Sequence, residues 1–390
     1  MNSQMPRIAI NIGSGYLPGI DFVVAGAVLA ASELGWEIVG IRDGYDGLLF
    51  PGRYPHGGLV NLRPEMIDAS GRGRSLIGSA ARTDPFHVRS INPENQVEEV
   101  DRSDDLLKAL HEAGIGAVIS LVGGSAITGL HALSVAFKLY RKGLRTICVP
   151  KSVENEIACV SQAFGYNSVL SHTAETLERI RIGAEDVGRL AVVEVPGQHA
   201  GWLALQSGMA ALADAILVPE IPFDLKKVAD ALRTHENEGR RPTLVVVADG
   251  ARPVNGVEVA EAQGGLRTSL TPNADPDFGE GEHVIDRTGA TSKSVAMGLQ
   301  RLTDRDVLPF ALGHLIRGGV PTVVDRQLGL AYGAGAVKAL HAGSEGVMIT
   351  FELPDIKRVP LAETLGRIRT VPAGSEIMKI ARSLGIAFGD

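Results

Sequence analysis

The sequence predicts an α/β protein of two doubly wound, Rossmann-like domains with mostly parallel sheets. Three observations predict this fold class. Short apolar runs of strand length alternate with segments of helical length, the alternation starts again near residue 161, and several runs are apolar at every position. Strands that are buried on both faces of a parallel sheet have this composition, and repeated β-α alternation is typical of doubly wound domains.

The first block of the chain begins with a βαβ unit. Arg7–Ile12 is predicted to be a strand, 13–19 a Gly-rich turn, Ile20–Leu34 a helix and Glu37–Arg42 a second strand. This order implies parallel strands with a right-handed crossover. The block continues with a strand at Ile115–Leu121, a helix at Gly129–Arg141 and a strand at Thr146–Val149.

The second block repeats the alternation. Its predicted elements are a helix at Ser171–Ile182, strands at Leu190–Val195, Ala215–Val218 and Thr243–Ala248, helices at Trp202–Ala213, Ser294–Asp304 and Gln327–Ala342, and a strand at Gly346–Phe351. Residues 252–292 differ, because they are polar and rich in Gly, Asp and Asn. A segment of that length without regular structure is usually functional, and we interpret it as a long excursion from the second domain.

Composition narrows the function classes. A formal net charge of -7 argues against nucleic acid as the main partner. No apolar run reaches the roughly 20 residues of a membrane helix, and residues 1–7 lack the apolar core of a signal peptide. We therefore expect a cytoplasmic protein without a membrane partner. Cys148 and Cys159 lie in apolar surroundings and are predicted to be reduced core thiols.

Pro150-Lys151-Ser152-Val153-Glu154-Asn155-Glu156 is the most informative segment, because it follows a buried-strand pattern. It places a Lys, a hydroxyl and two carboxylates at the carboxyl end of a strand, where open α/β sheets carry their chemistry. A Lys can neutralise a phosphate, and a carboxylate can take a proton. The alternative is a helix start whose acidic residues complement the helix dipole.

Two Gly-rich turns also follow predicted strands. Gly13-Ser14-Gly15 precedes a helix, and so does the turn 123–129. Such turns let backbone N–H groups approach a phosphate at a helix N-terminus, although glycines also serve plain tight turns.

Taken together, the motifs resemble those of the 6-phosphofructokinase superfamily, and most closely its pyrophosphate-dependent branch. The segment 150–156 resembles Pro-Lys-Thr-Ile-Asp-Asn-Asp, 193–205 resembles Val-Glu-Val-Met-Gly-Arg-His-Ala-Gly-Trp-Ile-Ala-Leu, and 313–319 resembles Gly-His-Ile-Gln-Arg-Gly-Gly. The turns 123–129 and 78–82 resemble Gly-Gly-Asp-Gly-Ser-Leu-Thr-Gly and Gly-Ser-Ala-Arg. The resemblance runs from Ile8 to about Gly346 in matching order.

The resemblance implies roles for the catalytic and donor-binding residues. Glu154 would be the base that takes a proton from the acceptor hydroxyl, with Lys151 and Gln198 near the transferred group. The implied cofactor is Mg²⁺, with Ser125 and Glu154 as its candidate ligands. The implied donor-binding residues are Ser14, Gly15, Tyr45, Arg82, Gly123, Gly124, Ser125 and Thr128.

It also implies an acceptor site for a sugar phosphate. His314 and Arg317 would bind the 6-phosphate, and Asp249 the sugar hydroxyls. The implied substrate-binding residues are Ser152, Glu156, Arg189, Gly197, Asp249, His314 and Arg317. Arg189 would reach the site of a neighbouring subunit, so we expect a homodimer or homotetramer.

The implied domains are a phosphoryl-donor domain, residues 1–152 with about 318–362, and an acceptor domain, 153–317 with about 363–390. We expect Gly124, Glu154, Gly197 and His314 to line the cleft between them. The implied activity is a glycolytic transfer from pyrophosphate or ATP to the 1-hydroxyl of fructose 6-phosphate.

The sequence departs from the family pattern mainly on the donor side. Ser125 stands where an Asp helps to hold magnesium, Gln198 stands in place of an Arg, and Tyr16 occupies the first Gly-rich turn. A weakened donor and metal site is therefore expected. Two alternatives stay open: a non-catalytic regulatory or structural subunit, and a phosphotransferase for another acceptor.

Overall fold

The structure is a computed structural model that describes residues 7–13, 15–67, 75–79, 84–91, 96–123, 130–254, 289–352 and 354–390. It divides into two compact units. Unit 1 comprises Met1–Ser168 and Arg317–Arg367, and unit 2 comprises Val169–Ile316 and Ile368–Asp390. The segment 153–168, which the sequence analysis assigned to the second domain, groups with unit 1. The donor and acceptor labels of the two domains stay predictions.

Unit 1 is built on a seven-stranded sheet with the order β13-β12-β7-β6-β1-β2-β3. The strands from β12 to β2 are parallel, and the edge strands β3 and β13 pair antiparallel. Their bounds are Arg7–Ile12 (β1), Glu37–Ile41 (β2), Leu59–Leu62 (β3), Ala117–Val122 (β6), Thr146–Pro150 (β7), Val347–Glu352 (β12) and Asp355–Pro360 (β13). A separate hairpin is formed by Val88–Ile91 (β4) and Val97–Val100 (β5).

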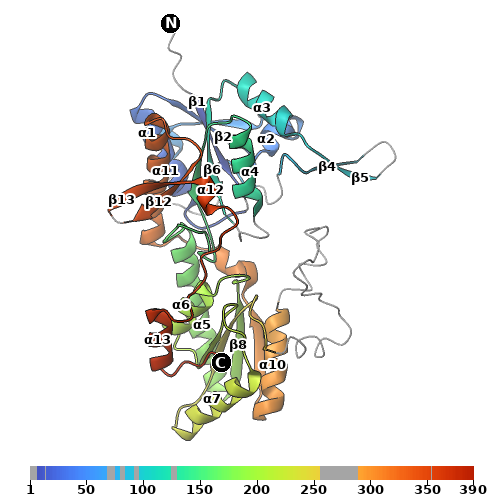
Figure 1. Cartoon of the computed structure of the whole chain (residues 1–390), viewed down its shortest axis with the longest axis vertical. Coiled ribbons are helices and arrows are strands. Elements are labelled where there is room, and N and C mark those ends of the chain that lie inside the picture. Colours follow the sequence, from blue (N-terminus) through green and yellow to red (C-terminus); the bar gives the residue numbers. More distant parts are fainter. Residues whose placement is uncertain are drawn as a thin grey trace. The chain divides into compact units, whose positions relative to one another are not determined.

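Helices cover both faces of the unit 1 sheet (Figure 1). They are Ile20–Glu33 (α1), Asp46–Leu49 (α2), Ser103–Glu112 (α3), Leu130–Arg141 (α4), Val323–His341 (α11) and Leu361–Thr364 (α12). The helices α1 and α11 pack together on one face, and α4 packs against β6 and β7. A Cβ on Gly333 of α11 would lie 2.0 Å from the Val23 carbonyl oxygen of α1, so this close approach needs a glycine.

Unit 2 has a four-stranded parallel sheet with the order β11-β8-β10-β9. The strands are Leu190–Val195 (β8), Ala215–Leu217 (β9), Leu244–Ala248 (β10) and Val307–Ala311 (β11). The helices are Trp202–Ala210 (α6), Leu225–Asn237 (α7), Ala290–Thr303 (α10) and Glu376–Ser383 (α13), and Tyr166–Asp186 (α5) enters the unit from unit 1. The predicted fold class, α/β with mostly parallel sheets, is confirmed.

Several predicted bounds are wrong, for identifiable reasons. The helix expected at Ser171–Ile182 begins at Tyr166, because the Asp325 carboxylate accepts hydrogen bonds from the N–H of Gly165, just before α5, and from the N–H of Ser168 in its first turn. The helix expected from Gln327 begins at Val323, because the Thr322 hydroxyl caps it. The helix expected from Ser294 begins at Ala290, so the excursion ends before residue 292; residues 255–288 lie outside the described part of the chain.

The two cysteines have different surroundings. Cys148 is buried in β7, as predicted, whereas Cys159 is exposed and has a positive φ of 62°. The prediction of a core thiol is therefore wrong for Cys159, because its loop turns the residue outward. No helix in the described ranges combines the length and hydropathy that crossing a bilayer needs.

Candidate functional site

The candidate donor site in unit 1 lies where three neighbouring parallel strands end. Lys151 follows β7, Gly123 follows β6, and Gly13 and Gly15 follow β1. The Lys151 ammonium donates a hydrogen bond to the Gly15 carbonyl oxygen at 2.7 Å. A Cβ on Gly123 would lie 2.0 Å from the Lys151 carbonyl oxygen, so a side chain does not fit there. The three strand-end turns are therefore held against one another.

Lys151 is a buried cation. Its side chain is only 2% exposed, and burial, followed by repulsion from the Arg317 charge, lowers its pKa to about 7. A buried ammonium is costly without a counter-charge. The assignment of this cation to the donor phosphates stays a prediction.

The segment after Lys151 is a turn built around one hydroxyl. Ser152 Oγ accepts hydrogen bonds from the N–H groups of Glu154 and Asn155, both at 2.9 Å, and donates to a carboxylate oxygen of Glu156. Ser152 and Glu156 are 3% and 1% exposed, and burial raises the pKa of Glu156. The two residues thus form an internal pair of the turn.

Asn155 completes the turn. It adopts a positive φ of 56°, and its side chain accepts from the Ala163 N–H at 2.9 Å and donates to the Ser161 carbonyl at 3.1 Å. Glu154 is only partly buried. The turn therefore holds the backbone of Glu154, the predicted base. The side chains of Ser152, Asn155 and Glu156 form hydrogen bonds within the protein. Sugar contacts by Ser152 and Glu156 stay predictions.

Two tyrosines lie near the predicted donor residues. Tyr45 is 3% exposed, its hydroxyl lies 3.3 Å from Ser120 Oγ, and burial raises its pKa to about 12. It packs in the core beneath α2 and α3, so its hydroxyl faces the protein interior and its assignment to the donor stays a prediction. Tyr16 is half-buried, and burial, followed by the Asp21 charge, raises its pKa. The remaining predicted donor residues, Ser14, Arg82, Gly124, Ser125 and Thr128, lie outside the described residues.

The candidate acceptor site in unit 2 also lies at the carboxyl ends of neighbouring strands. Gly197 follows β8, Asp249 follows β10, and His314 follows β11. The Gly197 N–H donates to Asp249 Oδ1 at 2.9 Å. A Cβ on Gly197 would lie 2.9 Å from that of Ala248, which explains the small residue. Parallel pairing therefore places these three predicted substrate-binding residues at one edge of the sheet.

Gln198 and His199 continue the turn after β8. Gln198 is exposed. His199 is partly buried, and desolvation, followed by the Arg252 charge, lowers its pKa. The imidazole of His199 is therefore neutral near neutral pH.

Arg189 lies at the opposite edge of the unit 2 sheet. It precedes β8, and its guanidinium lies 3.5 Å from the Asp306 carboxylate, which precedes β11. Within one chain it therefore does not join the strand-end residues of unit 2. Its predicted place in a neighbouring subunit's site stays a prediction.

The magnesium site implied by the sequence stays a prediction. In the described part of the chain, no group of three or more His, Cys, Asp or Glu side chains is placed to hold a metal ion. Mg²⁺ in phosphoryl-transfer sites commonly takes one or two carboxylates and completes its shell with water and substrate phosphates. Of the two predicted ligands, Glu154 lies within the described residues and Ser125 does not.

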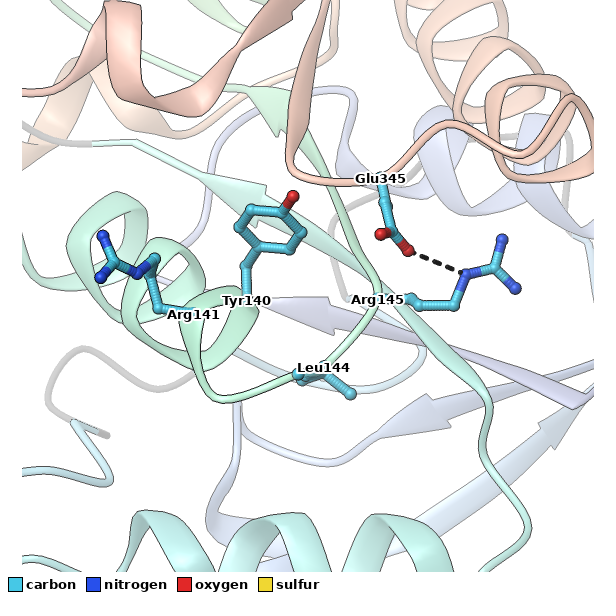
Figure 2. A pocket seen from close by; sticks show the side chains of 6 residues that line it. Tyr140, Arg141, Leu144, Arg145 and Glu345 are labelled. Atoms are coloured by element: carbon cyan, nitrogen blue, oxygen red, sulfur yellow. Dashed lines mark ion pairs between the residues drawn. The ribbon is translucent and has the colours of Figure 1, made fainter.

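A pocket of about 300 Å³ lies elsewhere on unit 1 (Figure 2). It is lined by the end of α4, including Tyr140, and by the loops before β7 and β12, where Arg145 and Glu345 form an ion pair of 3.3 Å. These loops are at the amino ends of the strands. The pocket is therefore at the opposite edge of the sheet from Lys151.

The chain is similar to known proteins along its length. A family profile described as Phosphofructokinase matches residues 7–340. An ATP-dependent 6-phosphofructokinase of Chloroflexus aggregans is 35% identical over 390 residues, covering 100% of this chain and 99% of that protein. A pyrophosphate–fructose 6-phosphate 1-phosphotransferase of Amycolatopsis methanolica is 34% identical over 377 residues, covering 94% of this chain and 96% of that protein.

The fold is also found among solved structures. The crystal structure of a pyrophosphate-dependent phosphofructokinase from Marinobacter aquaeolei superimposes with a TM-score of 0.70 at 17% identity, covering 99% of this chain and 93% of that one. At this level of identity the likeness supports the fold.

Proposed function

The chain belongs to the phosphofructokinase family, and from that membership we propose that it transfers a phosphoryl group from pyrophosphate or ATP to the 1-hydroxyl of fructose 6-phosphate. Family membership confirms the resemblance recognised in the sequence. Relatives named for each of the two donors cover nearly the whole chain at similar identity. The choice between pyrophosphate and ATP therefore needs an assay.

The observation that carries the proposal is the turn around Ser152. It fixes the backbone of Glu154 through the Ser152 hydroxyl, directly after the buried cation Lys151. General-base catalysis needs a carboxylate held within hydrogen-bond reach of the proton that it takes. A cation and a positioned carboxylate in one strand-end segment are the two groups that this transfer uses.

In the proposed reaction, Glu154 takes the proton of the sugar 1-hydroxyl while that oxygen bonds to the phosphorus of the donor. The bond between phosphorus and the leaving oxygen breaks, releasing inorganic phosphate from pyrophosphate or ADP from ATP. Lys151 would offset negative charge on the donor phosphates. When bound, Mg²⁺ would neutralise charge on the transferred group, with Glu154 as a candidate ligand.

The acceptor would be held by unit 2 residues at the carboxyl edge of its sheet, with His314 beside the 6-phosphate and Asp249 at the sugar hydroxyls. Arg317, which ends the same short helix as His314, would add a charge to the phosphate site. Charge-assisted hydrogen bonds from a guanidinium suit a phosphate dianion.

We also propose that turnover is slow. Ser125 replaces a metal-holding carboxylate of the family pattern, Gln198 replaces a cation, and Tyr16 occupies the first Gly-rich turn. Losing one donor that stabilises transition-state charge typically costs about 100-fold or more in rate. A non-catalytic sugar-phosphate-binding protein is the competing function.

A coupled assay separates the two. The wild type is given fructose 6-phosphate, magnesium and either pyrophosphate or ATP, alongside Glu154→Gln and the control Glu363→Gln, which changes an exposed Glu of α12. We expect turnover with one donor, loss of turnover in Glu154→Gln with sugar-phosphate affinity within a few-fold, and no change in the control. Sugar-phosphate binding without turnover on any donor would favour the non-catalytic function.

A further inference from the structure

Asp325 is a fully buried carboxylate in the first turn of α11. Its Oδ1 accepts the Gly165 N–H at 2.8 Å, and its Oδ2 accepts both the N–H and the hydroxyl of Ser168 at 2.6 Å. Burying a carboxylate is costly unless hydrogen bonds satisfy it, and three donors around the start of α5 satisfy this one. The carboxylate therefore joins two helices that are far apart in the sequence.

A second set of bonds joins the same two helix starts. The Thr322 N–H donates to Ser168 Oγ at 3.0 Å, and the Thr322 hydroxyl donates to the side-chain oxygen of Asn167 at 2.8 Å. The N-termini of α5 and α11 thus meet at Asp325, where their partial positive charges stabilise its negative charge. We call Gly165, Asn167, Ser168, Thr322 and Asp325 the Asp325 network.

The Asp325 network is connected to the turn that carries the candidate base. Phe164, the residue before Gly165, donates its N–H to the Pro150 carbonyl at 3.1 Å, and its own carbonyl accepts the Ser152 N–H at 3.3 Å. These bonds hold the two ends of one segment together. A displacement of Gly165 would therefore move the turn around Ser152.

The first Gly-rich turn packs against the same network. It ends at Gly19, which has a φ of 95° and begins α1, and a Cβ there would lie 3.7 Å from the Cβ of Asp325. Leu17 of this turn packs against Gly165, where a Cβ would lie 3.0 Å from the leucine side chain. From these starts α1 and α11 run side by side (Figure 1). The predicted donor turn therefore also rests on Asp325.

We propose that Asp325 is a positioning residue for phosphoryl transfer. It touches no substrate; it holds the first Gly-rich turn and the turn around Ser152 against one another and so sets the distance between the donor phosphates and Glu154. Both turns and the Asp325 network belong to unit 1. The part in phosphoryl transfer rests on the proposed function, whereas the holding of the two turns does not.

The first measurement is kcat in the coupled assay, on variants that circular dichroism shows to be folded at the assay temperature. Asp325→Asn should lower kcat by about 100-fold, since a misplacement of about 1 Å caused far from the chemistry costs that much. Thr322→Val should lower it less, and Thr322→Ser, which keeps the hydroxyl, should restore it. Val337→Ala is the control, because it removes buried side-chain volume further along α11. A merely structural role would leave kcat of every folded variant near that of the wild type.

Amide hydrogen exchange tests the holding of the two turns without any turnover. The Phe22 N–H donates to the last carbonyl of the first Gly-rich turn, and the Phe164 N–H donates to Pro150. In Asp325→Asn both should exchange about tenfold faster relative to the N–H groups of β6, because the bonds that hold these segments are weakened. A general loss of stability, as in Val337→Ala, would instead accelerate all of these groups by one factor.

The proposal is overturned if folded Asp325→Asn keeps the kcat of Val337→Ala, or if Phe22 and Phe164 exchange no faster relative to β6 than in the wild type. A wild type without turnover would contradict the proposed function, and the exchange measurement then decides alone. Joint acceleration of the two N–H groups in Asp325→Asn would still support the holding of both turns by this carboxylate.

Discussion

Removal of the Ser152 hydroxyl tests how the candidate base is positioned. In Ser152→Ala, the N–H groups of Glu154 and Asn155 lose the oxygen that accepts them at 2.9 Å, and the buried Glu156 carboxylate loses a donor. A buried donor left without a partner costs about 1–3 kcal/mol. With one N–H buried and the other partly buried, we expect the free energy of unfolding to fall by about 2–4 kcal/mol.

The loss should depend on pH. Burial raises the pKa of Glu156 above its ordinary value of 4.5, so the folded chain holds this proton longer than the unfolded chain and loses stability as the pH rises above 4.5. The Ser152 hydrogen bond opposes that rise in the pKa. Its removal lifts the pKa further, so the destabilisation by Ser152→Ala should grow as the pH rises through the raised pKa that Glu156 has in the folded wild type.

Denaturant unfolding at several pH values measures the stability, and the coupled assay measures the rate. A shift of about 1 Å in a catalytic group costs roughly 100-fold, so kcat should fall on that scale. Ser152→Thr is the matched control, because it keeps the hydroxyl and should retain most of both quantities. If Ser152→Ala leaves stability and kcat within the range of Ser152→Thr, the turn does not position Glu154 through this hydroxyl.

Three further predictions concern unit 1. Asp325→Asn should lower the free energy of unfolding by about 1–3 kcal/mol, because a fully buried carboxylate that caps α5 loses its charge. Asp355→Asn, in the exposed edge strand β13, is the control and should change the free energy of unfolding little. Thermal unfolding measures both. Gly123→Ala should lower the free energy of unfolding by about 1–3 kcal/mol, since its Cβ would lie 2.0 Å from the Lys151 carbonyl oxygen. Gly183→Ala, which has open space in α5, is the control, and equal stability of the two variants would contradict that packing. The pKa of Lys151 is about 7, so its charge is present below that pH and lost above it. The KM for the donor should therefore rise as the pH increases through 7. The same pH profile in Lys151→Met would refute a role of this charge in donor binding.

The strand ends could be predicted from the sequence because all-apolar runs mark buried parallel strands. Lys151, Gly197 and Asp249 each follow a largely apolar run, and each lies at the carboxyl edge of its sheet as a result. The elements missed were mainly amphipathic or exposed. The helices α3 and α7 lack an all-apolar run. The edge strand β11, Val-Leu-Pro-Phe-Ala, contains a proline, and its last residues are exposed.

Long-range hydrogen bonds explain the other differences. The start of α5 depends on Asp325, a residue far along the chain, and no local pattern around Tyr166 indicates it. The hydrogen bond between Ser152 and Glu156 is local, and their predicted contacts with the substrate stay predictions. Arg369 lies over the ring of Trp202, the first residue of α6, only because the C-terminal segment returns to unit 2.

The most direct test of the central claim follows the phosphoryl group itself. Phosphorus NMR of the wild-type protein with fructose 6-phosphate, magnesium and either pyrophosphate or ATP resolves the donor, the leaving phosphate and a phosphate at the sugar 1-position. Fructose 1,6-bisphosphate should form with one of the donors, and none should form in Glu154→Gln. Fructose 1,6-bisphosphate forming equally fast in Glu154→Gln, or from neither donor in the folded wild type, would contradict the account.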